Sequence, residues 1–174
     1  MSAALEHLRL MAGNNAYANE HLHEACCQLS SEEFAAPRTG FFPSLRETLN
    51  HIWEVDRYYL DALQEQGRGL SVFETPHLST AEALREAQKE VDAQLCGFCA
   101  ALCEADLARE VPHDRGEHGE FRESVASTLL HLFQHQIHHR GQAHAMLSGT
   151  GVEPPQLDEF FLKFDRHPSA LKHL

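Results

Sequence analysis

The stretch that decides the fold reads Leu129-Leu-His-Leu-Phe-Gln-His-Gln-Ile-His-His-Arg-Gly-Gln-Ala-His144. Its apolar residues recur at the spacing of an amphipathic α-helix, which turns by about 100° per residue. The pattern predicts a helix over residues 123–148, which Gly149 and Gly151 end. One arc of that helix collects its apolar residues: Val125, Leu129, Leu132, Phe133, Met146 and Leu147.

Three further stretches have the same periodicity, over residues 5–29, 44–66 and 80–104. Ser44 is placed to cap the second, and Gly67 and Gly69 end it. Four helices of about 20–26 residues with one apolar face each predict an all-α four-helix bundle. No repeat or linker divides the chain, so we expect one domain over residues 1–174.

Two segments outside the predicted helices have patterns of their own. Residues 107–124 alternate apolar and polar residues around Pro112, Gly116 and Gly119, which predicts a small hairpin or an irregular loop before the last helix. After Pro154 and Pro155 comes a tail whose apolar side chains need a surface to cover, either the bundle or a dimer interface: Leu157, Phe160, Phe161 and Phe164.

The amino-acid composition argues against several classes of protein. The chain has 174 residues, 43 % hydrophobic and 23 % charged, so it is long enough to bury a core without disulfides or a structural metal. A net charge of −12 argues against nucleic acid as a partner. No apolar run is long enough for a membrane span, and no export signal is visible at the start, so we expect no membrane partner and a cytoplasmic location. Five cysteines, an odd number, indicate reduced thiols.

The histidines of the last helix have metal-ligand spacing. Side chains four residues apart lie on one helical face, so His131 and His135, or His135 and His139, can share an ion. All three cannot, because His131 and His139 are separated by about 12 Å of helical rise. His139 lies within the apolar arc and His135 at its edge, which favours this second pair.

A further ligand must come from another element, and the second helix has one histidine, His51, in Leu49-Asn-His-Ile-Trp53. Three neutral imidazoles leave an open position on the ion, as in catalytic sites. The competing interpretation is that the spacing arises by chance in a chain with 14 histidines. The remaining histidines are expected to be solvated, and one site leaves their excess unexplained.

At these residues the chain resembles a known family. His135-Gln-Ile-His-His-Arg-Gly-Gln142 is similar to the His-x-x-x-His-Arg-Gly-Gln signature of the DinB/YfiT-like metalloenzymes. Asn15-Ala-Tyr-Ala-Asn19 resembles the first-helix Asn-x-Trp-Ala-Asn pattern of the family, with Tyr17 where Trp is usual. Leu49-Asn-His-Ile-Trp-Glu-Val-Asp56 resembles its second-helix segment. The three matches fall in order over residues 10–152.

The resemblance implies a four-helix bundle, usually a homodimer, with one divalent ion held by His51, His135 and His139. It also implies a small-molecule substrate, since members with known roles include transferases and isomerases that use low-molecular-weight thiols. Imidazole ligands suit zinc or nickel, with iron as the alternative.

Two charged residues, Asp56 and Arg140, fall in the middle of apolar faces, where a charge is costly unless it is paired. Our hypothesis is that they bond to each other or that one of them orients a ligand histidine. The alternative is that the helices are rotated and both side chains are exposed. Gln142 is a candidate to contact water or substrate near the ion, and Gly141 to allow close helix approach.

Cys96, Cys99 and Cys103 lie along one side of the third helix at spacings of three and four. A second metal site or a redox pair has such spacing, but these thiols border the apolar arc, which favours packing.

The sequence therefore favours a metal-dependent enzyme that activates a water or a low-molecular-weight thiol, as a hydrolase or a thiol transferase. Gln136 follows His135 where a His-Glu-x-x-His hydrolase has its base, which argues against peptide hydrolysis. The alternative is a non-catalytic metal-binding dimer with a stress-response or sensory role.

Overall fold

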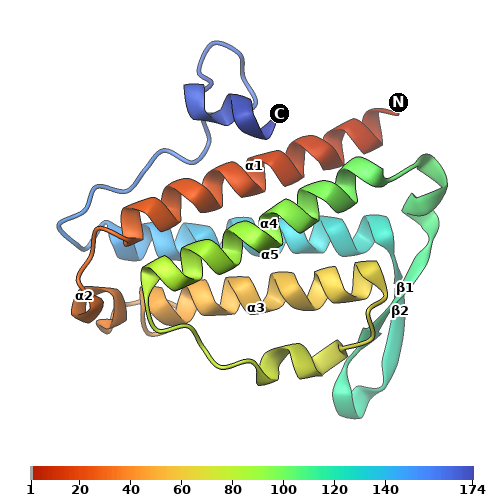
Figure 1. Cartoon of the computed structure of the whole chain (residues 1–174), viewed down its shortest axis with the longest axis horizontal. Helices are drawn as coiled ribbons and strands as arrows, with labels where there is room; N and C mark the ends of the chain where they lie inside the picture. The colour runs from red at the N-terminus through yellow and green to blue at the C-terminus, as the bar shows by residue number, and fades with distance from the viewer. Residues whose placement is uncertain (1) are drawn as a thin grey trace.

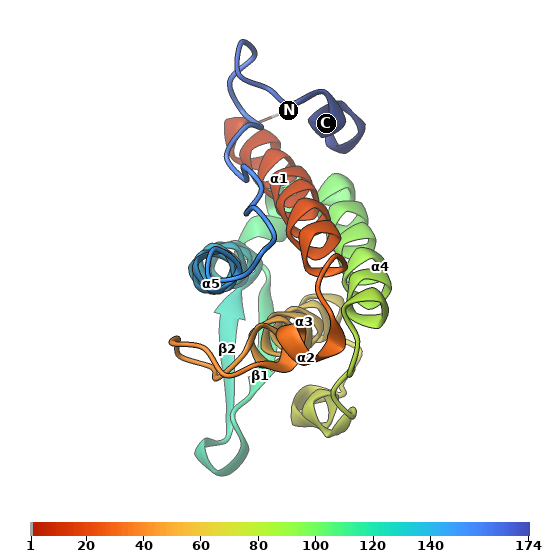
Figure 2. The same cartoon turned by 90° about the vertical axis from the view of Figure 1, so that its left-hand side faces the viewer.

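Four long helices lie side by side in the computed structural model, which describes residues 2–174 (Figure 1). They are α1 (Ala3–Cys26), α3 (Leu45–Gln64), α4 (Ala81–Ala101) and α5 (Val125–Leu147). Each helix contacts two neighbours, in the order α1, α4, α3, α5 around the bundle (Figure 2). The all-α four-helix bundle is thus confirmed. Within residues 2–174, no helix combines the length and the apolar character that crossing a membrane requires.

Each long helix begins at a hydroxyl side chain that accepts a backbone N–H of the first turn. Ser44 accepts from Glu47 at 3.1 Å, Thr80 from Ala83 at 3.2 Å and Ser124 from Ser127 at 3.1 Å, and Ser2 does the same for α1. Such caps stabilise a helix by about 0.5–2 kcal/mol each. The cap predicted at Ser44 is confirmed.

The shorter elements lie between these helices. Two strands, β1 (Glu110–Asp114) and β2 (Glu120–Ser124), pair antiparallel and confirm the predicted hairpin. A short helix that was not predicted, α2 (Ser31–Ala35), begins with a capping box between Ser30 and Glu33. Short 3-10 helices make up the rest: η1 (Gly69–Glu74), η2 (Glu104–Ala108), η3 (Gly116–His118) and η4 (Pro168–His173).

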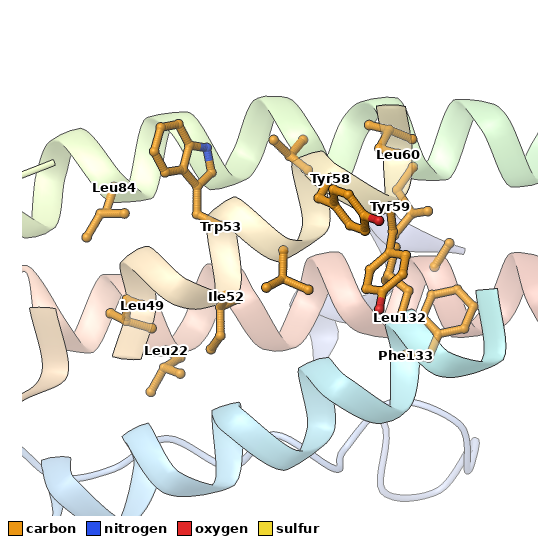
Figure 3. Packing of buried hydrophobic residues seen from close by; sticks show 14 of the residues in the cluster. Leu22, Leu49, Ile52, Trp53, Tyr58, Tyr59, Leu60, Leu84, Leu132 and Phe133 are labelled. Carbon is orange, nitrogen blue, oxygen red and sulfur yellow. The ribbon is translucent and has the colours of Figure 1, made fainter. Parts of the chain in front are cut away.

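The core draws on all four long helices (Figure 3). Leu22 of α1, Ile52 of α3, Leu84 of α4 and Leu132 of α5 are each at most 1 % exposed. Burying side chains of this size stabilises the fold by about 1.5–3 kcal/mol each, so the apolar faces hold the bundle together.

The tail covers one side of α1. Phe160 is fully buried and its ring lies 5.7 Å from the ring of Tyr17. Lys172 of η4 donates to Glu20 of α1 at 2.7 Å. Phe164, in contrast, is 83 % exposed, so the tail covers the bundle through Phe160 and not through Phe164.

Candidate metal centre

Three histidines from two helices converge on one point between α3 and α5. Nε2 of His51 lies 3.0 Å from Nε2 of His135, and one ring nitrogen of each of His51, His135 and His139 lies within 4.8 Å of the others. Two imidazoles on one ion at about 2.0–2.1 Å place their nitrogens about 3–3.4 Å apart. The donor set and its spacing therefore fit a divalent transition metal.

The helical phase explains which histidines meet. His139 is buried and His135 and His51 are partly buried, whereas His131 and His138 are exposed on α5. The rings of His135 and His139, one turn apart, have centroids 4.4 Å from each other, and the ring of His51 lies 4.6 Å from that of His139. The structure thus brings together the three histidines that the sequence selected.

The environment keeps these imidazoles neutral. Burial, reinforced by the neighbouring rings, lowers the pKa of His135 to about 3. Burial, followed by the neighbouring His139, lowers the pKa of His51 to about 4. The pKa of His139 is also lowered, again mainly by burial. A neutral ring has a free lone pair, which metal binding requires.

Gln142 fixes the orientation of one ring. Nδ1 of His139 lies 2.9 Å from Oε1 of Gln142, and because this oxygen can only accept, Nδ1 carries the hydrogen. Nε2 of His139 is then the nitrogen that is free for an ion. The amide nitrogen of Gln142 lies 3.0 Å from Nε2 of His138. Gln142, which we expected beside water or substrate, therefore contacts two imidazoles.

Two aromatic residues that the sequence analysis missed form a wall beside the histidines. The ring of Phe42 lies 4.4 Å from that of His51 and 5.7 Å from that of His139. Phe41, 77 % exposed, lies 6.2 Å from His139. The available signal was an apolar pair that Pro43 separates from the cap of α3, but the position of this pair beside the histidines depends on tertiary packing.

Asp56 and Arg140 are joined through a third side chain. Gln136 donates from Nε2 to Oδ2 of Asp56, and its Oε1 accepts from Nη1 of Arg140 at 2.9 Å. The expected direct bond is wrong, because Gln136 lies between the two charges. The rotated-helix alternative is wrong as well, since Asp56 is 0 % and Arg140 5 % exposed. Among the bonds of residues 2–174, neither reaches a ligand histidine.

The same network continues to α1 and α4. Arg140 donates to Oδ1 of Asn15 and, at 3.1 Å, to Oδ1 of Asn19. The amides of both asparagines donate to Asp92, at 3.1 and 2.9 Å. Gln88 donates to Asp92 at 3.2 Å and to the α3 carboxyl at 2.9 Å, which closes a ring through all four helices. The two asparagines of the first-helix motif therefore tie the bundle together.

Burial shifts the pKa values of the ionisable side chains in this network so that each side chain favours its neutral form. It raises the pKa of Asp56 well above its ordinary range, with the charge of Asp92 as the next cause, and it raises the pKa of Asp92 to about 6. Burial also lowers the pKa of Arg140 to about 10, which leaves the guanidinium charged at neutral pH. One guanidinium and one ionised carboxylate then compensate each other.

The cysteines agree with the packing interpretation. All five are free; Cys99 is fully buried and Cys96 packs against the core. Burial raises the pKa of Cys96 to about 11 and that of Cys99 to about 12, so neither is a reactive thiolate. Cys103 is exposed beyond the end of α4, because the helix stops at Ala101.

Comparison with known proteins agrees with this architecture. A DinB-like protein of Bacillus cereus has a similar structure (TM-score 0.62, 18 % identity, 80 % of this chain and 90 % of that chain covered). A DinB-like protein of Bacillus subtilis is also similar (TM-score 0.63, 16 % identity, 84 % and 96 % covered). No curated protein matches the chain. The sequence model of the DinB family matches residues 1–168, nearly the full length, and the chain belongs to the DinB family.

Proposed function

We propose that this protein is a metal-dependent enzyme in which His51, His135 and His139 hold one divalent ion. The observation that carries the proposal is the convergence of three imidazole nitrogens within 4.8 Å. Their neutral state and the bond from His139 to Gln142 support it, because both prepare lone pairs for a metal. Three imidazoles and no thiolate favour zinc or nickel, with iron as the alternative.

Such an ion, when bound, lowers the pKa of a water or a thiol that occupies its open position. Neutral ligands leave the charge of the ion undiminished for this purpose. The ring of Phe42 packs against that of His51 on one side of the site. Gln136, the neighbour of His135, is committed to the buried network and cannot accept a proton. This favours a small-molecule thiol transferase over a peptidase, with a simple hydrolase as the second choice.

A non-catalytic role is the alternative, and both versions include a homodimer. Leu130 is 60 % and Ile137 48 % exposed on the outer face of α5, which favours a second copy as a partner.

We also propose a cytoplasmic location, with which five unpaired thiols agree.

The test of the metal site is elemental analysis of protein purified without added metal. We expect about one ion per chain in the wild type and in a His131→Ala/His138→Ala control, and almost none in His135→Ala/His139→Ala. The control removes two exposed histidines of the same helix. Equal metal content in all three proteins would contradict the site. Circular dichroism establishes that each variant is folded.

Catalysis needs a separate measurement. Low-molecular-weight thiols are screened with electrophiles, using protein stripped by a chelator and protein reloaded with metal. Turnover that follows the metal supports the enzyme, whereas a loaded protein without turnover toward any pair favours the non-catalytic alternative.

A further inference from the structure

A second cavity lies next to the metal centre, and the proposed function does not use it. It has a volume of about 250 Å³ and lies between α3, α5 and the β1–β2 hairpin. Its lining is mostly polar: Tyr59, His113, Arg115, Glu123, Ser127, Thr128 and His131.

One residue of the cavity lining, His131, lies beside the metal centre. His131 precedes His135 by one helical turn, and their ring centroids lie 6.3 Å apart. The ring of Tyr59 lies 5.1 Å from that of His131. The ring of His131 therefore borders both the cavity and the metal centre.

Arg115 is a positioned cation at the mouth of the cavity. Its guanidinium carbon lies 5.6 Å from the ring of Tyr58 and 6.0 Å from that of Tyr59, and Nη2 donates to the Tyr59 hydroxyl at 3.5 Å. No carboxylate of residues 2–174 forms an ion pair with it, although Glu123 lines the same cavity. The guanidinium is exposed and retains donors for a ligand.

Three hydrogen bonds hold the loop that carries Arg115. Its backbone N–H donates to Gly119 at 3.0 Å, and the carboxylate of Asp114 accepts from Gly116 at 2.9 Å. Tyr58 donates to the carbonyl oxygen of Asp114 at 2.6 Å. A guanidinium on such a loop loses little freedom when it binds a ligand.

A buried histidine, His113, contributes to the lining of the cavity. The Thr128 hydroxyl donates to Ser124 O at 3.0 Å, so Nε2 of His113, 3.0 Å away, is the donor to Thr128. Burial lowers the pKa of His113, which keeps the ring neutral. Its Nδ1 is then a buried acceptor that has no hydrogen-bond partner among residues 2–174.

We propose that this cavity binds the carboxylate of a small organic acid through Arg115, while the rest of that substrate extends past His131 toward the three histidines. The inference rests on the proposed function. A planar monoanion matches the guanidinium fork, and the exposed His131 and Ser127 lie beside it. The net charge of −12 and the presence of Glu123 disfavour a phosphate dianion.

The test uses protein loaded with Co²⁺, in which a bound thiolate produces a charge-transfer band. Two carboxylates, mercaptoacetate and mercaptohexanoate, are titrated against their uncharged counterparts mercaptoethanol and mercaptohexanol. In the wild type we expect at least one carboxylate to bind about tenfold more tightly than its alcohol. Arg115→Gln should abolish this ratio and leave alcohol binding unchanged, and Arg115→Lys should retain part of it.

Arg122→Gln is the matched control, because Arg122 lies on the same hairpin but pairs with Glu110 and Glu120 outside the cavity. Its carboxylate preference should equal that of the wild type. A preference that survives in Arg115→Gln, or that is absent from the wild type, overturns this inference alone. Failure of every thiol to produce the band overturns the thiol-transferase form of the proposed function as well.

Discussion

Nε2 of His51 lies 3.0 Å from Nε2 of His135, although 84 residues separate them in the sequence. Two imidazoles meet this closely because α3 and α5 are neighbours in the bundle and each presents its histidine toward the other. Around them Gln142 fixes one ring and Phe42 covers one side. These surrounding contacts lead to the first prediction.

Gln142→Leu should weaken metal binding by about 10–100-fold without unfolding the protein. The substitution removes the acceptor of His139 Nδ1–H, so the ring no longer keeps one tautomer and one orientation. Competition with a chromophoric chelator measures the affinity. Gln142→Glu, which keeps an acceptor at the same place, should bind metal at least as tightly as the wild type. Equal affinity of the leucine variant would refute the orienting role.

Arg140→Met should destabilise the fold by about 3–5 kcal/mol at pH 8, because it leaves the buried carboxylate of Asp92 uncompensated. The loss should be smaller at pH 5. The raised pKa of Asp92, about 6, means that the folded state holds a proton there at pH 5, so less charge is stranded. Urea unfolding at both pH values measures the difference.

Arg140→Met/Asp92→Asn serves as the control for this charge argument. Removing the second charge should recover part of the stability at pH 8 and remove most of the pH dependence. A loss of equal size at both pH values in the single variant would show that packing, rather than charge, accounts for the destabilisation.

Periodicity shows which residues point inward, but not which residues they meet. It selected His51, His135 and His139, because a residue's direction from a helix follows from its position in the repeat. It also placed Asp56 and Arg140 inside. The bridge that Gln136 forms between them, in contrast, depends on the lengthwise register in which α5 packs against α3. That register is a property of packed side chains, which no single helix reveals.

Local sequence signals predict some features of the short segments but not others. The Ser30/Glu33 capping box that begins α2 was present in the sequence and is a recognisable start signal. The placement of Phe41 and Phe42 over the histidines had no comparable signal. Gly40 lies so close to Met146 of α5 that an added Cβ would clash, and only the folded chain shows this contact.

His23 should make the fold sensitive to acid. The expectation that the histidines outside the metal site are solvated is wrong for His23, which is 1 % exposed and whose ring nitrogens have no hydrogen-bond partner among residues 2–174. Burial, with Arg85 as the second cause, lowers its pKa to about 4. Between pH 6.5 and 4 the unfolded chain takes up a proton that the folded state refuses, so stability falls as the pH falls. The shift corresponds to about 3 kcal/mol, all of it present above pH 6.5.

The variant His23→Leu isolates this contribution from the other titrating groups. The difference in unfolding free energy between wild type and variant, measured by urea denaturation, should change by about 3 kcal/mol in favour of the variant between pH 7 and pH 4. A difference that stays constant with pH would mean that His23 titrates normally in the folded state.

The outer face of α5 should hold two copies of the chain together. Leu130 and Ile137 lie two turns apart on this face, and beside the exposed Gly141 nothing obstructs a neighbouring surface. Because each side chain is only about half exposed, burying it favours association by about 1 kcal/mol. Leu130→Glu/Ile137→Glu should therefore be monomeric in light scattering, whereas Leu171→Glu, at a 64 % exposed residue of η4, should leave the dimer intact. A wild type that is monomeric at high concentration, or a dimer that only Leu171→Glu disrupts, would place the interface elsewhere or exclude it.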